Sequence, residues 1–405
     1  MHTDISLEEA QNLLLEAVSP VSPTMVPLWY AAQRILSEDI AARYCIPPNN
    51  RSAMDGYAII ADDTKAANSD YPIILKAVEA GNNPVKRAVY RGACCRVMTG
   101  DQMPAGSDAV IKLENAAGKN GMIQISCPVG AGENVVVCGE DFMKGDLVAG
   151  RGSIITPGIA AALAGQGWGE VPIFRTVKIG ILSTGDELLY PTQRLETGKI
   201  YNMTLYGLNA RCRNLGAEVI DLGPVPDYPA AIAARIDEGL ARTDLVVITG
   251  GVSVGESDLV ETSLRQLGAD LLFHGVAMKP GSPALAASTN NKVVVGLSGN
   301  PAAALVGFEL LVIPLISRLQ GRGTVLPPRI KAVMADRFDK PSPQRRFLRG
   351  QLLPPADVNM VRLTGTQGNS VVKSMIGCNV LVDVPAGSGP ITYGQMVEGF
   401  LIGGE

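Results

Sequence analysis

Three polar loops carry most of the residues in this chain that could do chemistry, because they combine carboxylates, hydroxyls and glycines. Glycine lets the backbone come close to a ligand, and a helix that starts just after such a loop offers unpaired N–H groups to an anion. Carboxylates in the same place suit a hard cation such as magnesium, which prefers oxygen ligands. The pattern therefore indicates a site for a phosphate-bearing ligand and a metal ion. The loops are STGDEL at 183–188, GVSVGESD at 251–258 and SGNPAAA at 298–304.

Four acidic residues fall in or near these loops. Asp186 and Glu187 lie in the first loop, Asp258 ends the second, and Asp227 lies in the proline-framed segment PVPDYP at 224–229. Carboxylates alone repel a phosphate, and burying like charges together is costly. A bound cation would resolve both conflicts, because it bridges carboxylate and phosphate oxygens and polarises a phosphorus–oxygen bond. The alternative for each acid taken alone is a turn or, for Asp258, a helix cap.

Two further turns offer positive charge and a hydroxyl group. Lys279 lies on KPGSP at 279–283, where an ammonium can neutralise a phosphate or an oxyanion as a point charge. Ser298 offers a hydroxyl in the third loop. Asn300 and Pro301 are explained by a helix start alone, with Asn300 as N-cap and Pro301 in the first turn.

The apolar runs in front of the loops predict the elements that position them. VKIGIL, LVVITG and KVVVGL are short, rich in β-branched residues and continuously apolar, as strands covered on both faces are. Helical patterns follow each loop, so the segment is typical of βα units in a parallel, doubly wound α/β sheet. Ligands bind such sheets beyond the carboxyl ends of the strands. We expect the three loops and the Lys279 turn at that edge.

The rest of the chain predicts other elements. Residues 6–18 have the pattern of an amphipathic helix, with Ser6 as cap and Glu9 completing a capping box. Residues 42–145 alternate short strand-like runs with Gly and Pro, which predicts an inserted β-rich domain, and a small all-β domain is predicted after 326. The inserted domain contains three polar clusters that, taken singly, are typical of turns: RSAMDGYA at 51–58, MTGDQMPAG at 98–106 and GED at 139–141.

Composition narrows the class of protein. The 405 residues are 46% hydrophobic and 18% charged, which is ordinary for a soluble chain of two to four domains. The net charge of −4 argues against broad electrostatic binding to nucleic acid. We find no apolar run of membrane-spanning length, and the N-terminus MHTDISLEEA lacks the features of a signal peptide. A cytoplasmic protein is expected.

Cysteine and histidine usage argues against zinc. The seven cysteines are an odd number and include no C-x-x-C pair, which favours a reduced protein. Only two histidines occur, and we interpret His274 as a packed side chain rather than a ligand. Acid–base and metal chemistry would therefore depend on carboxylates, lysines, hydroxyls and backbone groups.

The combination of motifs resembles a known family, the molybdopterin molybdenumtransferases of the MoeA type, which also occur as the E domains of gephyrin and of its plant counterpart. RSAMDGYA, RVMTGDQMPAG, GED, STGDEL, GGVSVGESD, KPG and SGNP occur here in the family's order and approximate spacing, over essentially the whole chain. The resemblance implies a homodimer of four-domain subunits. It also implies an enzyme that takes adenylylated molybdopterin and molybdate, cleaves the pyrophosphate with Mg²⁺, releases AMP and yields molybdenum cofactor.

The resemblance further implies a division of the chain into four domains. The predicted ranges are 1–22 with 177–325 for the molybdopterin-binding α/β domain, 23–41 with 146–176 for a linking domain, 42–145 for the inserted β-rich domain and 326–405 for the C-terminal β domain.

The same resemblance implies a site shared between two subunits, with the inserted domain of one facing the α/β domain of the other. The implied catalytic residues are Asp55, Glu187, Asp227, Asp258 and Lys279. The implied metal ligands are Asp141, Asp186, Glu187, Asp227 and Asp258. The implied substrate-binding residues are Thr99, Ser183, Thr184, Gly185, Gly250, Gly251, Ser253, Gly255, Ser282, Ser298, Asn300, Pro301, Arg349 and Ser374, with Arg349 and Ser374 at positions linked to oxyanion binding.

The chain departs from the family where positive charge would hold molybdate. A second lysine usual in the family is Ser282 here, a lysine found in many members is Gly275, and QGSH is replaced by QGNS at 367–370. Each lost lysine could weaken oxyanion binding by about 1–3 kcal/mol. Three interpretations stay open: an active transferase with altered contacts, a tungstate-preferring transferase, and a weakened paralogue that acts as a pterin-binding or scaffold protein.

Overall fold

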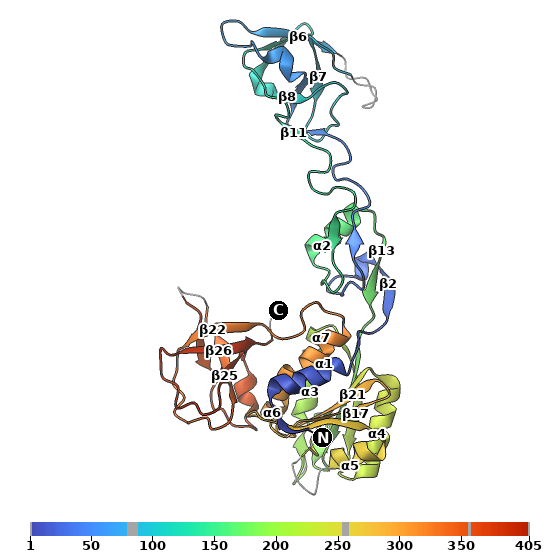
Figure 1. Cartoon of the computed structure of the whole chain (residues 1–405), viewed down its shortest axis with the longest axis vertical. Coiled ribbons are helices and arrows are strands. Elements are labelled where there is room, and N and C mark those ends of the chain that lie inside the picture. Colours follow the sequence, from blue (N-terminus) through green and yellow to red (C-terminus); the bar gives the residue numbers. More distant parts are fainter. Residues whose placement is uncertain (1, 79–87, 253–258, 355–357, 404–405) are drawn as a thin grey trace. The chain divides into compact units, whose positions relative to one another are not determined.

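The computed structural model describes residues 2–78, 88–252, 259–354 and 358–403. They form two compact units. The first unit comprises Met1–Glu38, Arg151–Ile155 and Val171–Glu405, and the second comprises Asp39–Gly150 and Thr156–Glu170. The first unit contains the predicted sheet and the C-terminal domain, and the second contains the β-rich insertion (Figure 1).

A seven-stranded sheet is the centre of the first unit, as the apolar runs predict. Four consecutive strands at one end of the sheet are parallel, and the strand next to them is antiparallel to both of its neighbours. In spatial order the strands are β1 (His2–Ile5), β19 (Asp270–Val276), β20 (Leu285–Thr289), β21 (Lys292–Leu297), β18 (Leu245–Thr249), β14 (Lys178–Thr184) and β17 (Glu218–Val225).

Helices cover both faces of this sheet, which confirms the doubly wound α/β class (Figure 1). Successive side chains of β18 point to opposite faces of the sheet. Because both faces are covered, the strand is buried along its whole length. Leu245 and Val247 pack with α1, α3 and α6, whereas Val246 and Ile248 pack with α4 and α5. The helices are α1 (Leu7–Glu16), α3 (Met203–Asn214), α4 (Pro229–Arg242), α5 (Leu259–Gln266), α6 (Pro301–Gly307) and α7 (Ile313–Leu319).

The helix after SGNP runs from Pro301 to Leu319 and is strongly apolar. A π-helical segment, Phe308–Val312, joins α6 to α7, and Gln11 of α1 donates a hydrogen bond to the Leu310 carbonyl at 2.7 Å. The resulting span Pro301–Leu319 has 19 residues and a mean hydropathy of 1.9, so the expectation that no run reaches membrane-spanning length is wrong. This is a core helix, because 89% of it is buried inside the protein.

The second unit is built on a six-stranded sheet with its own apolar core, in agreement with the predicted β-rich insertion. In spatial order its strands are β8 (Ala109–Lys112), β5 (Gly56–Ile59), β7 (Ala93–Val97), β6 (Ile73–Val78), β10 (Met122–Ile125) and β9 (Ala116–Lys119). Two short pairs, β4 (Arg51–Ser52) with β11 (Val135–Val136) and β3 (Ile40–Ala41) with β12 (Leu147–Ala149), and helix α2 (Pro157–Gly165) complete this unit.

The C-terminal part of the first unit is a closed five-stranded barrel, as the loss of helical period after 326 predicts. Its strands are β22 (Arg329–Met334), β23 (Arg346–Leu352), β24 (Met360–Leu363), β25 (Val380–Val384) and β26 (Met396–Leu401). The first unit also contains a two-stranded pair, β2 (Pro23–Pro27) with β13 (Glu170–Phe174). The predicted four-part division stays a prediction.

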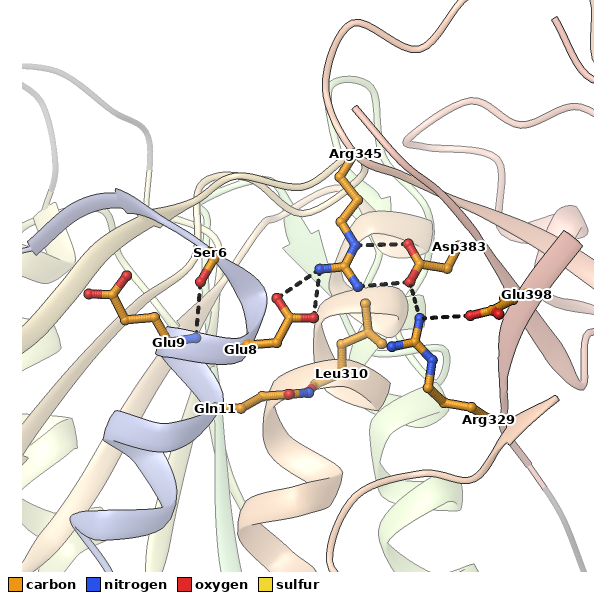
Figure 2. A network of polar contacts seen from close by, with 9 residues as sticks. All are labelled: Ser6, Glu8, Glu9, Gln11, Leu310, Arg329, Arg345, Asp383 and Glu398. Carbon is orange, nitrogen blue, oxygen red and sulfur yellow. Dashed lines mark hydrogen bonds and ion pairs between the residues drawn. The ribbon is translucent and has the colours of Figure 1, made fainter. Parts of the chain in front are cut away.

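One arginine ties the barrel to the first helix of the sheet domain (Figure 2). Arg345 donates two hydrogen bonds to Asp383 of β25, at 2.8 and 2.7 Å, and contacts both carboxylate oxygens of Glu8 on α1 at 2.8 Å. Arg329 adds a bond to the same Asp383 at 2.7 Å. The Asp383 side chain is only 6% exposed, so these bonds replace the water it has lost.

We expect Arg345→Ala to lower the free energy of unfolding by about 2–4 kcal/mol, because it leaves a buried carboxylate with one cation instead of two. Urea denaturation of the full chain measures the loss. The matched control is Lys331→Ala, since Lys331 is 74% exposed and lies 3.7 Å from Glu398. Its removal should cost about 0.5 kcal/mol or less. Equal losses in the two variants would show that the Arg345 contacts add no stability.

Candidate functional site

The predicted loops meet at the carboxyl edge of the central sheet. The Gly250 N–H donates to the Leu297 carbonyl at 3.1 Å, which joins the ends of β18 and β21. The Thr249 hydroxyl donates to Ser183 Oγ at 3.1 Å, which joins the ends of β18 and β14. Asn202, at the start of α3, donates to the same Ser183 oxygen at 2.9 Å. The structure therefore brings STGDEL, the start of the second loop and SGNP together.

Two glycines of this edge lie where a side chain would collide with its neighbours. Gly250 has φ of +91°, and a Cβ built on it would lie 2.8 Å from the Thr184 carbonyl oxygen. Gly185 has φ of +143°, and its Cβ would lie 2.7 Å from a carboxylate oxygen of Glu187. Gly250 needs glycine for its backbone conformation and for space, and Gly185 needs it for its backbone conformation. The two glycines therefore let the loops after β14 and β18 pack closely at this edge.

Three of the predicted metal ligands influence one another electrostatically at this edge. Partial burial raises the pKa of the Asp227 carboxyl; the nearby Thr184 hydroxyl opposes that rise, and the negative charges of Glu187 and Asp186 add to it. Thr184 Oγ1 is itself buried and makes no well-aligned hydrogen bond with the described residues. The Asp186 carbonyl accepts a bond from Lys199 Nζ at 2.7 Å. The edge is acidic, and a bound cation would reduce the repulsion between its carboxylates.

The donor set fits magnesium in chemical type, since all of its members supply hard oxygen atoms. Among the described residues, however, no three acidic, histidine or cysteine side chains converge as a ready-made metal-binding group. Asp258, a predicted ligand, lies outside the described residues, as do Ser253 and Gly255. The magnesium site therefore stays a prediction.

Replacing Asp227 by asparagine should stabilise the metal-free protein at neutral pH. A carboxyl whose pKa is raised in the folded state binds its proton more tightly there, so the parent protein loses stability as pH rises above the ordinary carboxyl range. Asp227→Asn removes that charge, and its advantage should shrink as the pH falls toward that range. Thermal melting in a chelating buffer between pH 4 and pH 8 measures the difference. A variant that is less stable than the parent at every pH would contradict the electrostatic explanation.

Lys279 lies where the sheet domain meets the barrel. Its N–H donates to the Arg345 carbonyl at 2.9 Å, and its own carbonyl accepts from the Phe347 N–H at 2.8 Å. Gly281 follows with φ of +100° and lets the KPG turn fold back. Lys279 helps to line a cavity of about 560 Å³ between this turn and the barrel. The other lining residues are Arg337, Phe338, Asp339, Lys340, Arg346, Leu363, Gly365, Thr366, Gln367, Gly368 and Asn369.

Arg349 and Ser374, which the resemblance links to oxyanion binding, are bonded to each other inside the barrel. Arg349 is 1% exposed, its Nε donates to Ser374 Oγ at 3.0 Å, and its Nη2 donates to the Gly368 carbonyl at 2.9 Å. Burial lowers the pKa of the Arg349 guanidinium to about 10. Neither residue is part of the cavity lining, so here they support the wall segment at Gly368.

The SGNP loop also contacts the barrel. Asn300 occupies the N-cap position of α6 with Pro301 next to it, as predicted, but its side chain makes no capping bond. Instead its Oδ1 accepts from the Ser370 hydroxyl at 2.6 Å, and its N–H donates to Ser298 Oγ at 3.2 Å. Ser282 contributes its carbonyl, which accepts from Val276 and Ala284.

The polar clusters of the inserted domain come together within the second unit. Asp55 accepts two hydrogen bonds from Thr99, one from the N–H at 2.7 Å and one from the hydroxyl at 2.8 Å. These bonds lower the pKa of the exposed Asp55 carboxyl. Asn50 accepts from the Cys138 N–H at 2.8 Å, and the Asp141 N–H donates to the Ile46 carbonyl at 2.9 Å. The clusters at 51–58 and 98–106 thus become neighbours, and GED bonds to the segment just before the first of them.

Two features of the first unit were missed or only partly foreseen. His274 is packed, as expected, with 8% exposure, but its Nδ1 lies 2.7 Å from a carboxylate oxygen of Glu261 on α5. Burial would raise the pKa of Glu261, yet the bonds from Arg265 and His274 lower it. Three of the four basic residues of the cavity wall, Arg337, Lys340 and Arg346, were missed as well. The arginine pair before FLRG was the only signal for Arg346.

Models of known protein families match three consecutive parts of the chain. Residues 5–167 match the MoeA N-terminal region (domain I and II), residues 180–318 match a probable molybdopterin binding domain, and residues 331–401 match the MoeA C-terminal region (domain IV).

Full-length relatives agree with these models. The chain is 34% identical over 406 residues to the molybdopterin molybdenumtransferase of Bacillus subtilis, covering 99% of this chain and 94% of that protein. It is 33% identical over 397 residues to the enzyme of the same name from Staphylococcus aureus, covering 97% and 94%. A crystal structure of the molybdopterin biosynthesis protein MoeA from Pyrococcus horikoshii has a TM-score of 0.84 and 30% identity, covering 98% of this chain and 100% of that chain.

Proposed function

Because the chain belongs to the molybdopterin molybdenumtransferase family, and so is a transferase of molybdenum cofactor biosynthesis, we propose that it inserts molybdate into adenylylated molybdopterin. In this proposal the pyrophosphate bond is cleaved with the help of magnesium, AMP is released and the product is the molybdenum-bearing pterin. The observation that carries the proposal is the convergence of Ser183, Gly250 and the acids of STGDEL at one sheet edge, in the same unit as the Lys279 cavity.

The residues of the edge have distinct roles in this proposal. The loops that contain Gly185 and Gly250 would bind the pyrophosphate, and Lys279 balances the charge of an incoming oxyanion. Asp186, Glu187 and Asp227 would hold magnesium, which when bound polarises the phosphorus–oxygen bond.

We further propose a cytoplasmic homodimer in which Asp55 and Thr99 complete the site of the partner subunit. Asp55 is held in place by Thr99 while remaining exposed, as a residue that completes another subunit's site would be. Large apolar side chains on the first unit also offer a contact surface, with Trp29 88% exposed and Tyr30 73% exposed.

The function is tested by incubating the purified protein with adenylylated molybdopterin and following AMP release. Release should require both magnesium and molybdate, with a parallel reaction in tungstate to test the preference for either oxyanion. A protein that binds the pterin but releases no AMP under any of these conditions would support the scaffold interpretation instead.

Chelation of magnesium should abolish AMP release and leave the melting temperature of the ligand-free protein nearly unchanged or slightly lowered. The reason is that the acids of the edge only repel one another without a cation, whereas the folded cores contain no metal-binding group within the described residues. Calorimetry of the same sample with and without chelator measures this. A large drop in melting temperature would show that a metal is structural.

A further inference from the structure

The cavity beside Lys279 is strongly positive although the chain as a whole is negative. The net charge of the protein is −4, yet four basic side chains and a single acidic one line this cavity of about 560 Å³. The acidic residue, Asp339, is largely neutralised by Arg337 at 3.6 Å. Within the described ranges, Lys279, Lys340 and Arg346 have no carboxylate partner. A concave surface of one sign concentrates ligands of the opposite sign.

Among these basic residues, Arg346 is the one whose main chain is hydrogen-bonded beside that of Lys279. The two residues are partners in a parallel β-bridge, which the bonds from Lys279 to Arg345 and from Phe347 to Lys279 close. Bridge partners project their side chains to the same face of the pair, and both residues line the same cavity. Arg346 therefore stands where a second cation beside Lys279 would stand.

The guanidinium of Arg346 packs against an aromatic ring, but its Nε lacks a hydrogen-bond partner within the described residues. It lies over the Phe338 ring, with its central carbon 5.3 Å from the ring centroid. Its Nε is buried and has no hydrogen-bond partner among the described residues. The preceding residue, Arg345, points to the opposite side of the strand, where Glu8 and Asp383 saturate it (Figure 2). A buried donor without a protein partner is costly, and Arg346 also lacks a carboxylate partner within the described ranges, so its guanidinium favours an anionic ligand.

The turn itself offers no second cation. Lys279 is the only basic residue of KPGSP, and Ser282 carries no charge. Position 275 cannot supply one, because Gly275 has φ of +92° and a Cβ there would lie 2.6 Å from a carboxylate oxygen of Asp4. Within the described residues, a second positive charge beside Lys279 is therefore supplied by the barrel domain, which contributes Arg337, Lys340 and Arg346 to the cavity lining.

We propose that Arg346 is a specificity-determining residue that binds a doubly charged tetrahedral oxyanion together with Lys279. The proposal rests on the function above, which makes molybdate that oxyanion. The planar guanidinium can donate to two oxygens of the anion at once, and Lys279 acts as a point charge beside it. Sulfate, with the same shape and charge, should compete for the site, whereas chloride should compete much less.

The test is titration calorimetry of the full-length protein with sodium molybdate. Arg346→Gln should weaken binding by about tenfold or more, the scale of one charged hydrogen bond. The matched control is Arg362→Gln, which removes the same charge from an exposed position of β24 that is not part of the cavity lining. It should stay within about twofold of the parent. Equal affinities for the parent and Arg346→Gln would overturn the proposal.

A second measurement needs no variant and so does not depend on the folding of one. Phenylglyoxal modifies accessible guanidinium groups, and mass spectrometry locates the modified residues. Molybdate should protect Arg346 in the parent protein and leave Arg362 reactive. Unchanged modification of Arg346 at saturating molybdate would contradict the assignment.

The outcomes also separate this inference from the function on which it rests. If the parent protein releases AMP and Arg346→Gln shows the same half-saturating molybdate concentration, the inference fails and the function stands. If the parent binds molybdate through Arg346 but never releases AMP, the anion site stands and the proposed reaction fails.

Discussion

Lys279→Ala is expected to lower kcat/KM for molybdenum insertion by about a hundredfold or more. Lys279 is a cation of the site whose main chain is fixed on both sides, by Arg345 and by Phe347. Those bonds involve only backbone atoms, so alanine preserves the turn and removes the ammonium alone. Losing one preorganised charged group in a partly water-excluded site costs about 3–4 kcal/mol of transition-state stabilisation. Steady-state rates of AMP release at varied molybdate measure the effect.

The control for this variant is Lys178→Ala in the same domain. Lys178 is 46% exposed and lies 3.9 Å from Glu218, so its charge is screened and far from the proposed chemistry. The control should keep rates within about twofold of the parent, with both variants melting at the temperature of the parent. If Lys279→Ala retained the rates of the parent, the cavity would not be the place where the oxyanion reacts.

The second large effect is expected when two inactive variants are mixed. Asp55→Ala and Asp227→Ala should each lose at least about a hundredfold in activity, because each removes one half of the proposed composite site. After subunit exchange, a dimer with one chain of each kind has one site that lacks both acids and one intact site. Random pairing should therefore restore about a quarter of the parent activity.

This mixing experiment distinguishes a site shared between two subunits from a site formed within one chain. If Asp55 and Asp227 acted within one chain, both sites of a mixed dimer would be damaged and mixing would restore nothing. The control mixes Asp227→Ala with Glu187→Ala, two variants of the same sheet edge, and should stay inactive. Native mass spectrometry of chains of different mass verifies that mixed dimers form. Mixed dimers without activity would contradict the shared site.

The central sheet could be predicted from the sequence because its signal is local. Each apolar run, such as LVVITG, has the length and continuity of a buried strand, and the edge of a parallel sheet collects the residues that follow. The meeting of Ser183 with Thr249 follows from that rule alone. The same holds for Ser6, whose side chain accepts a bond from the Glu9 N–H at 3.1 Å at the start of α1.

The cavity wall could not be predicted in the same way, because its contacts join segments far apart in the chain. Nothing local indicates that Arg345 faces Glu8 while Arg346 faces the cavity, since that depends on how the barrel sits against Lys279. Arg349, whose position the resemblance links to oxyanion binding, donates a hydrogen bond to Ser374 inside the barrel, and this contact also joins separate segments of the chain. The Asn300 side chain accepts a hydrogen bond from Ser370 instead of capping the helix, and this contact also joins segments far apart in the chain.

The most direct test of the account is to measure molybdenum in the pterin product. Purified protein is incubated with adenylylated molybdopterin, magnesium and molybdate, and the pterin is then isolated and analysed for metal and by fluorescence. We expect about one molybdenum per pterin with the parent protein, and almost none when magnesium is withheld or Lys279 is replaced by alanine. Pterin that leaves the parent protein without molybdenum, although AMP has been released, would contradict the central claim that this chain is the transferase.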